Sequence, residues 1–544
     1  MENPESTNFS PTYYWDYFQY VLRYLDKHYK NLLNPAESQF ISSFSQLSFS
    51  AQCLFLRLCG RRVAWFNRSQ LKYPEITDLS GAIQELIEEK FIGIYDEQVF
   101  TPNLLNVFTK QICLDLLSVD QTKSSFKSLS KAELVELLTD HSIPSSFIPE
   151  AWIRPLQAEN YAFVMFLFFG SKHRDLTEFV VRDLGHRQYV EISEDDFSPY
   201  FTTRKEIEDK WQISLWREWF FEQKDLLDPV HLQKSLVESL VPLAENLSEL
   251  AIPAYERVLF QVGRHLERQT FLEHALEVYE LSASAPSLER RVRILAKLKR
   301  LEEAIYWAEF GKEYVENPTE LHFFQDFLAR QASKLQIKQV TARLKKADKI
   351  EIDGSYQGRV EQGVIDYYQS QGYYAAFAEN GVWKNILGLL TWELIYEDRS
   401  AGFHHPFQYA PTVDFTQVNS ERFTQLIDTL LDLPLALEKM RSTAEQHQGQ
   451  INPLVDWVHL NWELIERVLE RVETSAVQQV LRLMWSRLST HAKGFPDLFI
   501  TKGDSYAFVE VKSPNDHLSA IQHFWHDAFA DLGISFQLIR VVWK

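Results

Sequence analysis

The feature that most constrains this 544-residue chain is a pair of apolar runs near its C-terminal end, within GFPDLFITKGDSYAFVEVK. The runs DLFIT and YAFVEVK flank Gly503-Asp504, a favourable two-residue turn for a β-hairpin. In the register that this turn sets, Asp497 lies directly opposite Glu510. The chain is therefore predicted to bring two acidic side chains together on one sheet.

Opposed side chains of a hairpin point to the same face, with Cβ atoms roughly 5 Å apart. Lys512, two residues after Glu510, shares that face. Because two such carboxylates repel each other, a divalent cation is the economical way to offset their charge. Oxygen ligands suit Mg²⁺ or Mn²⁺, and the site is expected to hold one or two such ions. A bound cation of this kind lowers the pKa of its water and neutralises charge on a phosphodiester. Asp497, Glu510 and Lys512 are therefore the candidate catalytic residues, with Lys512 placed to stabilise developing negative charge.

The alternative is that Glu510 and Lys512 are exposed partners on one strand, with Asp497 an incidental turn residue. The downstream sequence argues against this alternative. It predicts a helix over 518–532 and a strand over 534–543, so the order is β-β-α-β, with the carboxylates at one edge of a sheet.

The motifs GFPD and VEVKSPNDHLS resemble the virus-type replication–repair nuclease (VRR-NUC) module of the PD-(D/E)XK superfamily. With the helical segments described below, the whole chain resembles the Fanconi-associated nuclease family in its bacterial form. The resemblance implies a phosphodiesterase requiring Mg²⁺ or Mn²⁺, with 5′-flap endonuclease and 5′→3′ exonuclease activity on branched or flapped double-stranded DNA, in interstrand-crosslink repair. Two alternatives stay open: a Holliday-junction-type resolvase acting as a symmetric dimer, and a non-catalytic helical-repeat scaffold that binds DNA or protein.

The resemblance also implies a ligand set. The family's metal-binding aspartate and glutamate fall on Asp497 and Glu510, and Val511 would offer a backbone carbonyl. A further glutamate best matches Glu379, immediately before an apolar helix expected over 382–396. Glu393, inside that helix, is the rival.

One departure from the family pattern lies at Ile521, where eukaryotic relatives carry a basic residue. Their pocket for a terminal 5′-phosphate is therefore expected to be altered or absent here, with Arg290 and Arg291 as possible substitutes. Three nearby histidines are interpreted as substrate-facing or structural rather than catalytic: His517, His523 and His526.

Length and composition predict several domains with large cores. The chain has 45% hydrophobic residues but only 18 Gly and 20 Pro, which favours helices. The expected fold is a mostly α-helical N-terminal two-thirds followed by a C-terminal α/β PD-(D/E)XK nuclease module. Four domains are expected. Residues 1–120 form a winged-helix-like region, and residues 121–225 form a SAP-like region with a linker. Residues 226–370 form tetratricopeptide-like helical repeats, and residues 371–544 form a nuclease domain with a helical insertion at about 400–475.

The formal net charge of −19 means that DNA contacts must come from local basic surfaces. In the first domain, Phe49, Cys53, Leu56 and Cys59 have helical spacing, and FIGIYDEQVF predicts a short β-hairpin, as in a winged helix. Five basic residues there are candidate DNA contacts, with an ordinary solvated helix face as the alternative: Arg57, Arg61, Arg62, Arg68 and Lys72.

The SAP-like assignment depends on a capping box formed by Ser130 and Glu133. Leu134, Leu137 and Leu138 are expected to form the apolar face of the helix that follows. An ordinary helical hairpin is the alternative for this segment.

The repeat assignment depends on the similar segments FLEHALEVYELS and RLEEAIYWAEFG, with Ala275 and Ala304 in matching places. Small residues at fixed positions let paired helices pack closely. Between the segments lies RRVRILAKLKR, whose basic residues are either phosphate contacts or a solvated face. The candidates for DNA contact are Arg290, Arg291, Arg293 and Lys297.

The chain has three cysteines, too few for a disulfide framework, which favours a reducing compartment. The N-terminal sequence does not read as a signal peptide, and no apolar run is long enough to span a membrane. A cytoplasmic protein, nucleoid-associated when it acts on DNA, is expected. Protein partners are not predicted.

Overall fold

The computed structural model describes most of the chain, namely residues 10–61, 63–97, 100–117, 126–139, 143, 147–184, 188–333, 339–379, 381–396, 402–408, 410–411 and 420–544. The chain divides into two compact units. The first comprises Met1–His186 and Pro199–Trp211, and the second comprises Arg187–Ser198 and Gln212–Lys544. Across the described residues, none of the helices has the length and apolar character needed to cross a bilayer.

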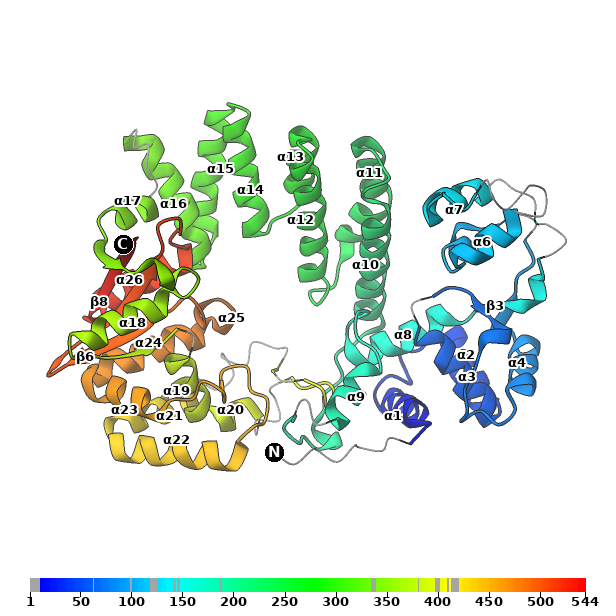
Figure 1. Ribbon diagram of the computed structural model, residues 1–544, viewed down its shortest axis with the longest axis horizontal. Coiled ribbons are helices and arrows are strands. Elements are labelled where there is room, and N and C mark those ends of the chain that lie inside the picture. The colour runs from blue at the N-terminus through cyan, green and yellow to red at the C-terminus, as the bar shows by residue number, and fades with distance from the viewer. Residues whose placement is uncertain are drawn as a thin grey trace. The chain divides into compact units, whose positions relative to one another are not determined.

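The first unit is mainly helical (Figure 1). Its helices are α1 (Tyr13–His28), α2 (Pro35–Gln46), α3 (Phe49–Cys59), α4 (Leu79–Glu88), α5 (Pro102–Leu105), α6 (Lys110–Leu117), α7 (Lys131–Thr139), α8 (Ala158–Phe169) and α9 (Thr177–Asp183). Helix α10 (Arg204–Gln223) begins in the first unit and ends in the second. Helix α8 contains all but the last residue of the aromatic-rich segment YAFVMFLFFG, and most of the side chains of that segment are buried, as its composition requires.

The predicted hairpin at FIGIYDEQVF is wrong. Strand β2 (Ile92–Ile94) pairs with β3 (Trp152–Pro155), which also pairs with β1 (Phe66–Asn67) in an antiparallel sheet of order β1-β3-β2. Tyr95, the residue after β2, is buried, and its N–H donates to the carbonyl of Trp152. The partner of β2 is therefore a strand remote in sequence.

The capping box predicted before α7 is confirmed. Ser130 N–H donates to the carboxylate of Glu133 at 2.6 Å, and Glu133 N–H donates to Ser130 Oγ at 3.3 Å. Leu134 and Leu138 are buried, but Leu137 is 40% exposed, so it was wrongly assigned to the apolar face.

A row of paired helices begins the second unit, where α12 to α16 stand side by side (Figure 1). Its members are α11 (Pro229–Ser235), α12 (Ile252–Arg268), α13 (Leu272–Glu280), α14 (Ala285–Lys297), α15 (Leu301–Tyr314), α16 (Pro318–Ser333) and α17 (Gln339–Lys345). The two matching alanines, Ala275 on α13 and Ala304 on α15, are completely buried in one core. Their small side chains let neighbouring helices approach closely.

The C-terminal module contains a mixed sheet, within the described residues, of order β4-β8-β7-β6-β5. Its strands are β4 (Asp348–Ile352), β5 (Tyr374–Phe377), β6 (Leu498–Lys502), β7 (Ser505–Lys512) and β8 (Phe536–Trp543). The predicted hairpin of β6 and β7 is confirmed in its register, with Lys502 opposite Ser505 and Leu498 opposite Val509. The predicted order β-β-α-β is also present, with α26 (Ala520–Asp531) between β7 and β8.

Placing the carboxylates at a sheet edge was wrong. β4 and β5, which the sequence did not predict, extend the sheet on both sides, so β7 is its central strand. Helix α18 (Val360–Ser370) packs against one face through Val364 and Ile365. On the other face, Phe508 of β7 contacts Trp383 and Phe529. Glu510 and Lys512 lie on this second face because side chains alternate along β7.

The helix expected over 382–396 is divided at Thr391 into α19 (Val382–Leu390) and α20 (Trp392–Tyr396). The Thr391 hydroxyl donates to the carbonyl of Leu387 at 2.7 Å, as threonine does where a helix bends. The helices that follow are α21 (Ser420–Asp428), α22 (Leu433–His447), α23 (Trp462–Arg471), α24 (Thr474–Ser486) and α25 (Leu488–His491).

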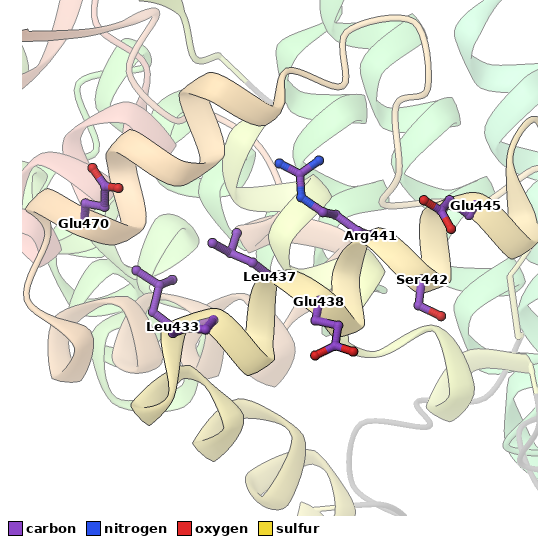
Figure 2. A pocket seen from close by; sticks show the side chains of 8 residues that line it. Leu433, Leu437, Glu438, Arg441, Ser442, Glu445 and Glu470 are labelled. Carbon is purple, nitrogen blue, oxygen red and sulfur yellow. The ribbon is translucent and has the colours of Figure 1, made fainter.

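A cavity of about 710 Å³ lies along α22, with Leu433, Leu437 and Arg441 on its wall (Figure 2). Glu470, from α23, also lines it. Neither Asp497 nor Glu510 is among its lining residues, so this cavity is separate from the candidate active site.

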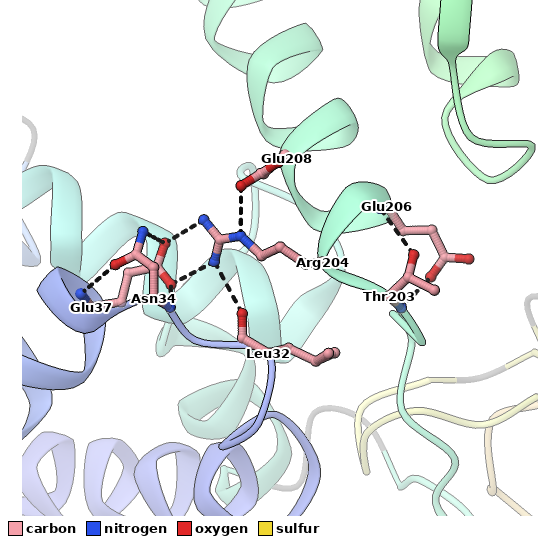
Figure 3. Close-up of polar contacts among 7 residues, drawn as sticks. All are labelled: Leu32, Asn34, Glu37, Thr203, Arg204, Glu206 and Glu208. Carbon is pink, nitrogen blue, oxygen red and sulfur yellow. Dashed lines mark hydrogen bonds and ion pairs between the residues drawn. The ribbon is translucent and has the colours of Figure 1, made fainter.

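In the first unit, the start of α10 is joined to the start of α2 by a polar network (Figure 3). Asn34 and Glu37 form a capping box on α2, with Glu37 N–H donating to Asn34 Oδ1 at 2.9 Å. The Arg204 guanidinium donates to both carboxylate oxygens of Glu37, at 2.6 and 3.0 Å, and to the carbonyl of Leu32. One glutamate thus stabilises the end of one helix and holds a second helix.

Candidate active site

Three adjacent strands, β5, β6 and β7, bring acidic residues to the same end of the sheet. Asp497 immediately precedes β6, and the register of β6 with β7 continues outward to place it opposite Glu510. On the other side, Phe377 pairs with Leu498, and the N–H groups of Ala378 and Glu379 donate to the carbonyl of Asp497 at 2.7 and 3.1 Å. The hairpin and its neighbour therefore assemble the site from segments far apart in sequence.

The carboxylate of Asp497 is fixed by the backbone of β7. Its Oδ2 accepts a hydrogen bond of 2.7 Å from the N–H of Val511, and only 7% of the residue is exposed. This bond orients the Asp497 side chain toward β7 and the residue that opposes it.

Glu510 is 1% exposed and shares one of its oxygens between two donors. Its Oε1 accepts from Lys512 Nζ at 2.7 Å and from Gln522 Nε2 at 2.7 Å. Lys512 is itself 8% exposed, so the ion pair is almost completely desolvated. The structure thus brings together the three predicted catalytic residues and adds Gln522, from α26.

Burial raises the pKa of both carboxyl groups. The pKa of Asp497 rises to about 7, chiefly through desolvation and also through Glu379 and Glu361, against the lowering by the Val511 N–H and Lys512. The pKa of Glu510 rises to about 8 through desolvation and the charge of Asp497, against the lowering by Lys512. Two acids that resist ionising together form a site that gains from a bound cation.

The donor set fits a hard divalent cation, because two carboxylates and a backbone carbonyl at Val511 are all oxygen ligands. Within the described residues, no three His, Cys, Asp or Glu side chains converge as a ready-made metal cage. Glu379 is exposed at the rim, close enough for its charge to raise the pKa of both acids. Its role as a ligand stays a prediction.

The rival glutamate, Glu393, is engaged elsewhere. Its carboxylate lies 3.6 Å from Lys439 Nζ and 4.0 Å from an Arg422 nitrogen. Sequence reasoning overlooked Glu361, at the start of α18, whose charge acts on Asp497. It also overlooked Gln522, although the spacing Ser519-x-x-Gln522 is a recognisable capping-box signal.

Of the three nearby histidines, His517 is exposed and the other two contact Asp527. His523 is 4% exposed, and burial lowers its pKa to about 4, so its ring is uncharged at neutral pH. Ile521 packs against the backbone of Gly494. The φ of Gly494 is +77°, a backbone conformation that residues with a side chain rarely adopt.

The basic residues predicted for the first domain are not all on one helix. Arg57, on α3, is ion-paired with Glu75 at 2.6 Å and lies over the ring of Tyr14. Arg61 lies over Tyr73. Three candidates remain: Arg68 in a short 3₁₀ turn, Lys72 on the surface, and Arg62 outside the described residues. That these residues contact DNA stays a prediction.

The arginines of α14 are paired within the protein. Arg290 bonds to Glu267 at 2.9 Å, and Arg291 bonds to Glu280 at 2.8 Å while stacking on the ring of Trp307. Arg293 bonds to Glu289 at 2.7 Å. Lys297 is exposed at the end of α14. Contact of any of the four with DNA is still a prediction, and Lys297 is the most accessible.

Comparison with known proteins agrees with this architecture. Residues 12–93 match the family model described as the FAN1 HTH domain, and residues 435–543 match the VRR-NUC domain. The second match includes both strands of the active-site hairpin and α26. The C-terminal module is therefore a nuclease of the VRR-NUC class.

Similarity to whole proteins extends over nearly the full chain. A Fanconi-associated nuclease 1 homolog of Pseudomonas aeruginosa is 27% identical, over 95% of this chain and 93% of that protein. The homolog of Oryza sativa is 24% identical, over 98% of this chain and 63% of its own length. The chain is therefore similar to Fanconi-associated nucleases over nearly its whole length.

The fold is also shared with solved structures. The structure of paFAN1 bound to DNA with a one-nucleotide 5′ flap and a gap is similar, with a TM-score of 0.84 and 25% identity, over 98% of this chain and 100% of that one. A second paFAN1 structure, bound to a two-nucleotide 5′ flap with a gap, has the same TM-score and 24% identity, over 100% of each chain.

Proposed function

We propose that this chain is a structure-specific DNA nuclease that hydrolyses phosphodiester bonds at 5′ flaps with Mg²⁺ or Mn²⁺, in the repair of interstrand crosslinks. The observation that carries the proposal is the buried opposition of Asp497 and Glu510, with Lys512 2.7 Å from Glu510. The family relationship supports the reaction class. The paFAN1 structures, each bound to a 5′ flap, support the substrate.

Asp497, Glu510 and the carbonyl of Val511 would hold the cation, with Glu379 as a further ligand from the rim. When bound, the cation neutralises charge on the phosphodiester and acidifies water for the attack. The Val511 N–H keeps Asp497 turned toward Glu510. Lys512 keeps its ammonium at the carboxylate of Glu510, where it is placed to stabilise negative charge that develops on the phosphate.

Because the whole chain is acidic, DNA must be held by local basic side chains. The exposed side chains of Lys72 and Lys297 are the best placed for phosphate contact. The ion-paired arginines Arg57, Arg290, Arg291 and Arg293 are proposed as secondary contacts, together with Arg61, Arg62 and Arg68.

Cleavage mapping tests the proposal. End-labelled 5′-flap, 3′-flap and four-way-junction DNA would be incubated with the protein in Mg²⁺, in Mn²⁺ and in chelator. We expect metal-dependent cutting near the base of the 5′ flap and little on the 3′ flap. Paired symmetric nicks on the junction would instead favour a resolvase, and no cleavage of any substrate would favour a scaffold.

The matched variants are Asp497→Ala and Asp504→Ala. Asp497→Ala should abolish cleavage but leave flap binding unchanged, because the residue lies in the site and not on a basic surface. Asp504, an exposed aspartate in the hairpin turn, should be dispensable for both.

A further inference from the structure

Gln522 is held at both ends of its side-chain amide. It is the third residue of α26, and its Oε1 accepts a hydrogen bond of 3.0 Å from the backbone N–H of Ser519, while Ser519 Oγ accepts from the Gln522 N–H at 3.3 Å. Its Nε2 donates to Glu510 Oε1 at 2.7 Å. Because the oxygen is used by the helix cap, the nitrogen is the end that must face Glu510.

The bond from Gln522 determines which oxygen of Glu510 is available. Lys512 and Gln522 both donate to Oε1. Within the described part of the chain, Oε2 accepts no hydrogen bond. The two donors therefore fix the side chain of Glu510 and leave its second oxygen for another ligand.

The helix that carries Gln522 is anchored on its other side. The next residue, His523, is buried against the ring of His322 of α16, with ring centroids 4.4 Å apart. Arg343 of α17 hydrogen-bonds to His523, and it donates to Asp527 at 2.7 Å. The backbone of Gln522 is thus held in place between the active-site strand and the helical row.

Helix capping alone does not account for glutamine at this position. A capping box works equally well with glutamate, and a negative charge in the first turn of a helix is favourable. Glutamate here, however, would place a second carboxylate against the buried carboxylate of Glu510. Only an uncharged donor serves both the cap and Glu510.

We propose that Gln522 is a positioning residue of the nuclease site, which fixes the carboxylate of Glu510 so that Oε2 faces the divalent cation. This inference rests on the proposed function, because it assumes that Glu510 is a metal ligand. Gln522 itself does not contact the cation, and it acts through Glu510.

Three variants separate positioning from capping. Gln522→Met removes the donor to Glu510 and the acceptor for Ser519. Gln522→Glu keeps the acceptor and removes the donor. Ser519→Ala removes one hydrogen bond of the cap and leaves the amide of Gln522 in place. Each full-length variant is compared with the wild-type protein in Mn²⁺ affinity, measured by electron paramagnetic resonance without DNA, in melting temperature, and in flap cleavage over a Mn²⁺ series.

We expect Gln522→Met to weaken Mn²⁺ binding by about 10- to 100-fold, as loss of a residue that orients a ligand does, with cleavage partly restored by excess Mn²⁺. Ser519→Ala should lower the melting temperature but keep Mn²⁺ affinity within about twofold of wild type. Gln522→Glu keeps the acceptor of the cap but sets a carboxylate against Glu510, so it should lose cleavage.

The role of Gln522 as a positioning residue would be overturned if Gln522→Met bound Mn²⁺ as tightly as wild type does, or if Gln522→Glu cleaved as wild type does. The proposed function would stand in either case. Failure of the wild-type protein itself to bind Mn²⁺ would overturn both.

Discussion

Replacing Asp497 by asparagine should stabilise the metal-free protein at high pH while abolishing cleavage. Asparagine keeps an oxygen that can accept from the Val511 N–H, and it removes the charge that Glu510 opposes. Lys512 retains its partner Glu510 in this variant. The substitution therefore removes one repulsive charge without leaving a buried cation unpaired.

The magnitude follows from the pKa of Asp497, which burial raises from 3.8 to about 7. A carboxyl group whose pKa is higher in the folded state binds more protons there, so stability falls as pH rises through the interval between the two values. Fully ionised, the group costs up to roughly 4 kcal/mol, of which about 2 to 3 kcal/mol accrues between about pH 5 and about pH 8.5.

The assay is hydrogen exchange of the β7 amides around Val511 in chelator, at about pH 5 and about pH 8.5, corrected for intrinsic rates. Local exchange is preferable because a chain with two units does not unfold in one step. The free energy of the opening that exposes these amides should be higher in Asp497→Asn than in wild type. This difference should grow by about 2 to 3 kcal/mol between the two pH values. Asp504→Asn, at the exposed turn, should show no such growth. An advantage for Asp497→Asn that is equal at both pH values would refute the reasoning.

Three further predictions concern other contacts. Lys512→Met should reduce flap cleavage by about 100-fold or more, with unchanged flap binding in a mobility-shift assay. The control is Lys502→Met, which changes an exposed lysine of β6 and should cut normally. Normal cutting by Lys512→Met would contradict the role of Lys512. Lys297→Ala should reduce the dependence of DNA affinity on salt concentration by about one ion contact without changing the melting temperature. Arg290→Ala should chiefly lower the melting temperature, because Glu267 loses one of its two arginine partners and keeps only Arg264; identical behaviour of the two variants would be the contrary result. Arg204→Leu should cost roughly 1 to 3 kcal/mol in the unfolding of the first unit, because Glu37 loses its partner, and Arg204→Lys should cost less; an unchanged unfolding curve for Arg204→Leu would rule this out.

The hairpin and its register were predictable from sequence because they depend on local information. Gly503-Asp504 defines the turn, and strand alternation then determines that Glu510 and Lys512 share a face. By contrast, β4 and β5 are short strands whose partners lie more than a hundred residues away, so no local pattern revealed them. The same reason explains the wrong hairpin at β2.

Side-chain partners were the other limit of sequence reasoning. The basic run on α14 suggested a phosphate surface, but Arg290 is bonded to Glu267 on a different helix. Likewise, Gln522 was visible as a helix cap, and its contact with Glu510 depends on how α26 packs on the sheet. Such pairings depend on tertiary structure and cannot be inferred from spacing along one segment.

The central claim is that Asp497 and Glu510 together bind a catalytic cation, and anomalous X-ray diffraction from crystals soaked in Mn²⁺ tests it most directly. The expected result is an anomalous peak about 2 Å from an oxygen of Asp497 and an oxygen of Glu510, which disappears in Asp497→Ala. A Mn²⁺ peak held by other residues, with none between these two carboxylates, would contradict the claim.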